Sequence, residues 1–335
     1  MEFAELNEDQ RRRLVDVRQI YEAWRVADAE LRHGYRGTMR WRRVAGAEYL
    51  YLIAGKVERS LGVRSPATER IKSDHDHHRD RLKRRLATLD ARIKEMARIN
   101  RAAGLGRVPT TAARILRRLD GAGLLGRHLF VVGTHALFAY EAAAGIVFES
   151  GLTATTDVDL LWDARRRLSL ALVDVRAEGV LGLLRKVDHT FVAPRNSFRA
   201  VNDEGYYVDI IRALEKDEMR AVNTRISPVD DDLEAAALAG LEWLINAPKF
   251  EQIVVGADGI PLWMSCIDPR AFALHKYWIS RRDDRDPLKR RRDAAQARAV
   301  AAVAVEYLRL EFSVKELSAL PADLVRAGEA LIRAA

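Results

Sequence analysis

The segment TATTDVDLLWD, residues 153–163, places two aspartates, Asp157 and Asp159, inside a run that otherwise has the composition of a buried strand. On a strand, residues i and i+2 point to the same face, so the two carboxylates project side by side. They repel each other, and burying them is costly unless something pairs with them. A divalent cation between them removes that cost, and hard oxygen ligands favour Mg²⁺ or Mn²⁺.

The neighbouring sequence supplies further parts of such a site. HLFVVG (128–133) has the pattern of a buried strand, and it ends at Gly133-Thr134. The glycine lets backbone N–H groups approach a phosphate, and the N-terminus of the helix that follows adds donors and a favourable dipole. Asp209, in YYVDII, lies on the second arm of a hairpin predicted over 198–213. A third carboxylate on a neighbouring strand completes a site for two metal ions around a phosphoryl group.

The composition limits the classes of protein to which this chain can belong. The 335 residues are 48% hydrophobic, carry a net charge of +8 and include one cysteine, Cys266. This predicts a folded chain without intramolecular disulfides, which fits a reducing cytosol. The N-terminus lacks the apolar core of a signal peptide, and no stretch approaches ~18 uncharged apolar residues, so we expect a soluble cytoplasmic protein with no membrane contact. The arginine excess favours polyanions, although a GC-rich genome produces the same bias.

The first 125 residues are predicted to be mainly helical. Apolar spacing indicates a helix over 5–33, and glycine with aromatic and β-branched residues indicates a hairpin over 39–55. SLGVRSPATER (60–70) is predicted to be a loop that leads into a highly basic helix over 66–102, which is typical of a coiled-coil arm. A helix over 109–126, N-capped by a threonine and closed by glycines, completes this region.

Beyond residue 126 strands and helices alternate. The expected strands and hairpins share β-branched runs bounded by turn residues; they cover 128–133, 155–163, 190–195, 198–213 and 250–268, the last with an Asp258-Gly259 turn. The expected helices share apolar residues at helical spacing; they cover 134–145, part of 165–187, 230–246, 269–282 and 289–311.

This succession resembles the nucleotidyltransferase superfamily that includes DNA polymerase β, the CCA-adding enzymes and the aminoglycoside nucleotidyltransferases. The signature of a strand, Gly-Gly or Gly-Ser, a helix, Asp-x-Asp and a later Asp appears here as VVGTHALFAYE, TTDVDLLWD and YYVDIIRAL. Thr134 departs from the usual serine but keeps the hydroxyl. Several blocks, such as GRVPTTAARILRRLDGAGLLG, are also similar to a bacterial family of nucleotidyltransferase-fold proteins over most of residues 40–310.

The resemblance implies an α+β fold, with a polymerase β-like core of mixed sheet and flanking helices plus a helical N-terminal region and C-terminal helices. It divides the chain into an N-terminal region with a long basic arm (1–125), a catalytic core (126–225), and a hairpin with helices that completes the nucleotide site (226–335). The oligomeric state does not follow from it.

The resemblance also implies roles for single residues. Asp157 and Asp159 hold two Mg²⁺ (or Mn²⁺) ions, and Asp209 holds the catalytic metal and receives the proton of the acceptor. Gly133 and Thr134 hold the β and γ phosphates of the NTP.

Cationic residues are implied by a more distant likeness, to abortive-infection and toxin nucleotidyltransferases. These proteins place a lysine on a C-terminal helix before a basic, aspartate-containing segment, and a similar set is present here: Lys276 with Arg281, Arg285, Lys289 and Asp293. These residues, Lys276 and Arg285 among them, are therefore expected near the nucleotide, and a toxin or phage-defence role is implied. Arg165 or Arg166, just after the acidic strand, is a further candidate for neutralising the triphosphate.

These roles predict transfer of a nucleoside monophosphate from an NTP such as ATP to a hydroxyl, with release of pyrophosphate. The acceptor is an RNA 3′ end (a tRNA, for example), a protein or a small molecule, and the basic residues over 79–98 favour RNA. One alternative is a non-catalytic nucleotide- or RNA-binding protein that retains the fold; the presence of all three aspartates argues against it. Another is a nucleic-acid-binding protein that uses the helix over 66–102.

Overall fold

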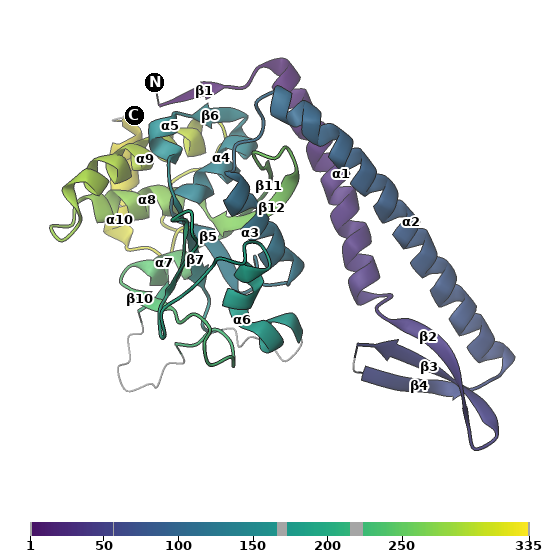
Figure 1. Cartoon of the computed structure of the whole chain (residues 1–335). Coiled ribbons are helices and arrows are strands. Elements are labelled where there is room, and N and C mark those ends of the chain that lie inside the picture. Colours follow the sequence, from purple (N-terminus) through teal and green to yellow (C-terminus); the bar gives the residue numbers. More distant parts are fainter. Residues whose placement is uncertain (1, 56, 166–172, 215–223, 334–335) are drawn as a thin grey trace.

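The computed structural model describes residues 2–55, 57–165, 173–214 and 224–333 (Figure 1). A body built around a mixed sheet carries an arm that projects from one side. A short N-terminal strand, β1 (Phe3–Glu5), joins β6 (Ile146–Phe148) on the body and so anchors the start of the arm. No helix in the described ranges combines the length and the apolar run that crossing a membrane requires.

The arm consists of two long helices that pack against each other, with a small antiparallel sheet at the far end (Figure 1). Its elements are α1 (Glu8–His33), β2 (Thr38–Val44), β3 (Ala47–Ala54), β4 (Val57–Val63) and α2 (Pro66–Ala102).

The bounds of α2 match the sequence prediction because its start is encoded locally. Ser65 and Thr68 form a capping box, and Pro66 occupies the first helical position. The hairpin predicted over 39–55 is confirmed as β2 and β3. The loop predicted from residue 60 is wrong as far as Val63, because β4 pairs with β3 although most of its residues are exposed.

The body contains one large mixed sheet, which in the described residues has seven strands in the order β10-β9-β7-β5-β12-β11, with β8 also paired to β9. The strands are β5 (Leu129–Val132), β7 (Asp157–Trp162), β8 (Arg199–Val201), β9 (Tyr207–Ala213), β10 (Ala236–Leu238), β11 (Lys249–Val255) and β12 (Pro261–Ile267). β7 runs parallel to β9 but antiparallel to β5. The sheet is therefore mixed and flanked by helices, which confirms the predicted α+β fold.

Helices cover this sheet and enclose one large apolar core that includes Val131, Leu160 and Ile210. They are α3 (Thr110–Gly121), η1 (Gly133–Ala136, a 3-10 turn), α4 (Leu137–Ala144), α5 (Ser150–Thr153), α6 (Val173–Arg185), α7 (Leu241–Asn246), α8 (Pro269–Ser280), α9 (Pro287–Glu306) and α10 (Ala322–Arg333). α8 and α9 pack against each other, and Figure 1 shows them together at one side of the body.

Several sequence predictions of the body are confirmed, and others need correction. The hairpins over 198–213 and 250–268 are present. The strand predicted over 190–195 is wrong, because this segment makes only one bridge, Val192 to Val201. The helix predicted over 230–246 is also wrong in its first half, where β10 pairs with β9 before Gly240, at φ +83°, turns the chain into α7.

Two helix starts differ from the sequence expectation. The helix predicted from 109 begins after Pro109, and no threonine side chain caps it. The helix predicted from 134 begins as the 3-10 turn η1 and becomes regular only at Leu137. In the predicted helix over 165–187, residues 166–172 lie outside the described ranges, and α6 is kinked at Gly179.

Candidate active site

The register of the central strands brings the three predicted carboxylates together. Asp159 on β7 lies opposite Asp209 on β9 and opposite Val132, the last residue of β5. Residues paired in this way share a face of the sheet, and Asp157, two positions earlier on β7, faces the same side. The start of β7 and the neighbouring part of β9 therefore carry a cluster of three acids, which we call the carboxylate cluster.

Gly133 is the position where the chain turns over this cluster. It has φ +64°, a left-handed conformation that favours glycine. A Cβ at this position would lie 2.2 Å from Oδ2 of Asp159. The absence of a side chain thus lets the backbone at the start of η1 approach the Asp159 carboxylate closely.

The negative charge of Asp159 is only partly compensated by its surroundings. Its burial, together with the nearby Asp157, raises the pKa of its carboxyl to about 6, although Lys276 and Arg199 act in the opposite direction. Among the described residues, none donates a hydrogen bond to this carboxylate. A partly buried carboxylate with two acidic neighbours and no donor of its own is an arrangement that a cation would stabilise.

The other two acids have partners of their own. Arg199 on β8 holds Asp209 bidentately, with Nε to Oδ1 at 2.7 Å and Nη2 to Oδ2 at 2.5 Å. The hydroxyl of Thr155 donates to Asp157. In this arrangement no three acidic, histidine or cysteine side chains of the described residues converge on one metal position. The donor chemistry of the three carboxylates nevertheless fits Mg²⁺ or Mn²⁺, since these ions prefer grouped hard oxygens.

Lys276 and Arg285 are brought together beside the cluster by a buried acid on α9. Nζ of Lys276, on α8, donates to Oδ1 of Asp293 at 2.7 Å, and Nε of Arg285 donates to Oδ2 at 2.8 Å. Burial lowers the pKa of Lys276, whereas Asp293 and Asp159 act to raise it. Lys276 is therefore within electrostatic reach of Asp159, and Arg285 is linked to it through Asp293.

Thr134 is buried where η1 meets α9. Its hydroxyl accepts a hydrogen bond from Nη2 of Arg292 at 2.7 Å, and Arg292 also donates to the carbonyl of Ala154 at 3.0 Å. The hydroxyl predicted for a phosphate contact is thus engaged by α9. Within the described ranges, Arg292 and Arg199 are cations near the cluster that sequence reasoning missed; the pairing of β8 with β9 and the packing of α9 against η1 reveal them.

Arg165 lies away from the carboxylate cluster, so the structure does not bring it together with the other predicted phosphate contacts. It follows the far end of β7, where Nε donates to Oδ1 of Asp163 at 2.8 Å and Nη1 donates to Asn246 at 2.5 Å. Because the strand carries the chain away from Asp157, Arg165 is separated from the cluster by the length of β7. Arg166 lies outside the described residues.

Behind the cluster, the neutral ring of His135 fills the space between η1 and the hairpin. Nε2 of His135 lies 3.3 Å from the hydroxyl of Tyr206, and burial lowers the pKa of the imidazole to about 4. His135 therefore carries no charge at neutral pH and packs in the interior.

A family described as Nucleotidyltransferase matches residues 110–321, well over half of the chain. The chain therefore belongs to a nucleotidyltransferase family. The matched range contains the carboxylate cluster and the α8–α9 cations but not the arm. No curated protein and no solved structure matches the chain.

Proposed function

We propose that the protein transfers a nucleoside monophosphate from an NTP such as ATP to an acceptor hydroxyl, in a reaction that depends on Mg²⁺ or Mn²⁺. The observation that carries this proposal is the carboxylate cluster, in which Asp159 is packed against the Gly133 turn with no hydrogen-bond donor among the described residues. Membership of a nucleotidyltransferase family supports the reaction class.

Asp157, Asp159 and Asp209 are the residues that would hold the divalent ions. Bound there, such ions neutralise phosphate charge and polarise the attacking oxygen. Asp209 accepts the proton of the acceptor hydroxyl as the hydroxyl oxygen attacks the α-phosphorus, and pyrophosphate leaves. Positioning and charge stabilisation supply most of the rate enhancement.

The surrounding cations bind the triphosphate. Backbone N–H groups after Gly133 approach phosphate oxygens, with Arg292 beside them at the hydroxyl of Thr134. Lys276 and Arg285 add positive charge from α8 and the segment after it. Arg199 exchanges the Asp209 carboxylate for a phosphate oxygen, because guanidinium groups bind both anions with the same bidentate geometry.

The acceptor that we propose is RNA, because the arm carries many exposed basic residues that suit a polyanion. The toxin or defence role implied by the distant resemblance stays a prediction.

The direct test incubates the protein with each α-labelled NTP, Mg²⁺ or Mn²⁺, and total RNA, protein extract or a small-molecule pool. We expect metal-dependent transfer of label that is lost in Asp159→Asn and Asp209→Asn. Asp203→Asn is the matched control, because Asp203 is an exposed acid in the turn between β8 and β9. Transfer that survives both cluster substitutions would contradict the proposal.

One observation favours a second candidate, a non-catalytic nucleotide- or RNA-binding protein. Arg199 already occupies both oxygens of Asp209, as in a closed structural ion pair. This candidate predicts NTP or RNA binding that does not require metal, with no transfer of label to any acceptor. The same assay distinguishes the two candidates.

A further inference from the structure

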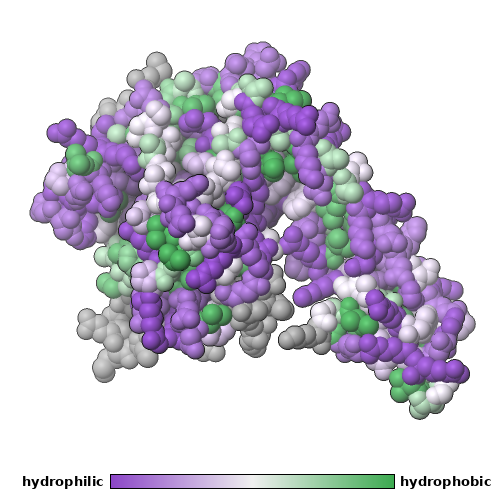
Figure 2. All heavy atoms as spheres, in the orientation of Figure 1, coloured by the Kyte–Doolittle hydropathy of each residue, from purple (hydrophilic) through white to green (hydrophobic). Residues whose placement is uncertain are grey.

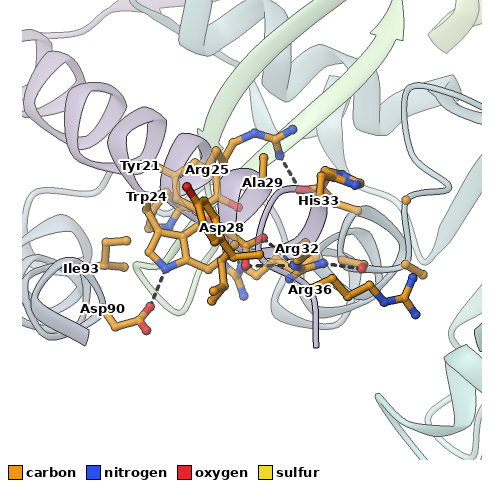
Figure 3. Close-up of a pocket in the computed structure, with 18 of the residues that line it drawn as sticks. Tyr21, Trp24, Arg25, Asp28, Ala29, Arg32, His33, Arg36, Asp90 and Ile93 are labelled. Carbon is orange, nitrogen blue, oxygen red and sulfur yellow. Dashed lines mark hydrogen bonds and ion pairs between the residues drawn. The ribbon is translucent and has the colours of Figure 1, made fainter. Parts of the chain in front are cut away.

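A groove of about 730 Å³ lies between the arm and the body, and Figure 3 shows it in close-up. Its walls come from α1 and the middle of α2 on the arm, and from the end of α3 and the turn between β11 and β12 on the body. None of its lining residues belongs to the carboxylate cluster. It is therefore a separate site, and we call it the arm groove.

The arm groove has an excess of positive charge. Its charged lining residues in the described chain are Arg25, Arg32, Arg36, Arg79 and Arg117 against Asp28, Asp90 and Asp120. Three of these arginines are neutralised by ion pairs: Arg25 with Asp120, Arg32 with Asp28 at 2.8 Å, and Arg117 with Asp258 at 2.7 Å.

Two arginines have no such partner. Arg36 and Arg79 make no hydrogen bond or ion pair with any residue in the described part of the chain. Nε of Arg79 is also shut off from solvent without a hydrogen-bond acceptor. A buried N–H without an acceptor is costly, so this guanidinium points to a ligand that brings acceptor oxygens.

Flat aromatic side chains line the same groove. The rings of Tyr21 and Trp24 are stacked, with centroids 5.6 Å apart and an interplanar angle of 2°, and Tyr35 also contributes. Figure 3 shows Trp24 among Arg25, Arg32 and other groove residues, with its indole N–H bonded to Asp90. Arginines that bind phosphates beside rings that stack on bases are the combination that recognises single-stranded nucleic acid.

Exposed positive charge continues on the arm beyond the lining of the groove. Figure 2 shows a mainly hydrophilic surface on the arm. Its exposed basic residues include Arg81, Lys83, Arg84 and Arg85 on α2, and Arg40, Arg43 and Arg59 on the small sheet. A polyanion longer than the groove itself therefore finds further contacts along the arm.

We propose that the arm groove binds a single-stranded segment of RNA. That this RNA is the acceptor of the nucleotidyl transfer rests on the proposed function above; the binding itself does not. An acidic protein segment fits less well, because it would satisfy the arginines but leave the aromatic rings without bases to stack on.

The test measures binding of a fluorescently labelled 12-nucleotide single-stranded RNA to the full chain by anisotropy, over a series of salt concentrations. In the double variant Arg36→Gln/Arg79→Gln we expect the Kd to rise about 10-fold or more. The slope of log Kd against log salt should fall by about 1.4, since each lost phosphate contact on a single strand contributes about 0.7. The control Arg98→Gln/Arg101→Gln removes two exposed arginines of α2 that lie outside the groove, and it should change the Kd less than threefold.

A second variant separates stacking from charge. Trp24→Leu should raise the Kd about 5- to 100-fold with an unchanged salt slope, because stacking on a base involves no counterions. Trp24→Phe keeps a ring and should recover part of the affinity, and thermal melts check that each variant is folded. A duplex of the same sequence should bind less tightly, since its bases are not free to stack.

Two results would overturn the arm groove as an RNA site. One is equal RNA affinity in the groove variant and its control. The other is polyglutamate binding as tight as RNA binding and equally weakened by the groove substitutions. The proposed function fails separately: if Asp159→Asn binds RNA normally and no protein sample transfers label, the groove stands and the catalytic proposal falls.

Discussion

The two ends of β7 both carry acids, and the protein treats them in opposite ways. At the far end, Asp163 is buried and Arg165 binds both of its oxygens. At the near end, Asp159 lies beside Asp157 and Asp209 and accepts no hydrogen bond from the described residues. An acid needed only for stability is neutralised by the chain itself. An acid without a hydrogen-bond donor of its own, at the glycine turn of a nucleotidyltransferase, is the one expected to bind a ligand.

The largest expected effect is on nucleotidyl transfer, which should depend on the acid at the near end of β7 and not on the acid at its far end. Asp159→Asn should lower label transfer about 10³-fold, because it removes metal-mediated charge stabilisation worth about 4 kcal/mol. Asp163→Asn should leave transfer within about threefold of the original protein. The check is initial rates with one α-labelled NTP at saturating Mg²⁺. Similar losses in both variants would remove the distinction between the ends.

The next effect is the pH dependence of the stability of the protein, which we expect from Asp159 at the near end of β7. Because the pKa of Asp159 is raised from 3.8 to about 6, the folded protein holds this proton more tightly than the unfolded chain. The resulting stability is present below pH 3.8 and is lost as pH rises through 6, up to about 3 kcal/mol. Urea unfolding of the original protein in EDTA between pH 4 and 7 should show this loss of stability. The loss over the same pH range should be smaller in Asp159→Asn. Equal pH profiles would contradict the account.

At the far end of β7, substitution of Asp163 should lower the stability of the protein and leave its activity nearly unchanged. Asp163→Asn replaces a charge-assisted bidentate contact with Arg165 and should lower the free energy of unfolding by about 2 kcal/mol. Asp159→Asn, which removes like-charge repulsion in the metal-free protein, should raise it or leave it unchanged. Urea unfolding at pH 7 in EDTA compares the two, and a stability loss larger in Asp159→Asn would reverse the comparison.

The smallest expected difference between paired variants tests the glycine turn. Gly133→Ala introduces a Cβ at positive φ and against the Asp159 carboxylate, whereas Gly205→Ala, at φ +73°, introduces one at positive φ into open space. Both variants lose about 1 kcal/mol of stability from backbone strain. Gly133→Ala should lose about 1 to 2 kcal/mol more from the steric clash and should also transfer label more slowly. Equal losses would show that the approach to Asp159 does not require glycine.

Local signals explain which elements the sequence could predict. α2 was predicted with its bounds because Ser65, Pro66 and a long apolar stripe are all local features. The segment 230–246 was not, because only its pairing with β9 makes Ala236–Leu238 a strand. β4 likewise depends on β3, since its own residues lack an alternating apolar pattern.

The residues of the site likewise fall into those that local sequence features predict and those whose positions only the folded structure shows. Asp157, Asp159 and Asp209 were each expected on a strand, and the three acids were expected to lie close together. The pairing of β7 with β9 places Asp159 opposite Asp209. The position of Arg165 could not be inferred from its nearness in sequence, since a strand moves the chain by about 3.3 Å per residue. Arg199 contacts Asp209 through the β8–β9 register; the hairpin predicted over 198–213 contains both residues, but the prediction did not specify which residues pair.

Calorimetric titration of the protein with an NTP, with and without Mg²⁺, shows whether the carboxylate cluster is a metal-dependent nucleotide site. We expect binding of at least one NTP at millimolar Mg²⁺, and its loss both in EDTA and in Asp159→Asn, while Asp163→Asn binds as the original protein does. Binding that is equal with and without the metal, or unchanged in Asp159→Asn, would contradict this expectation.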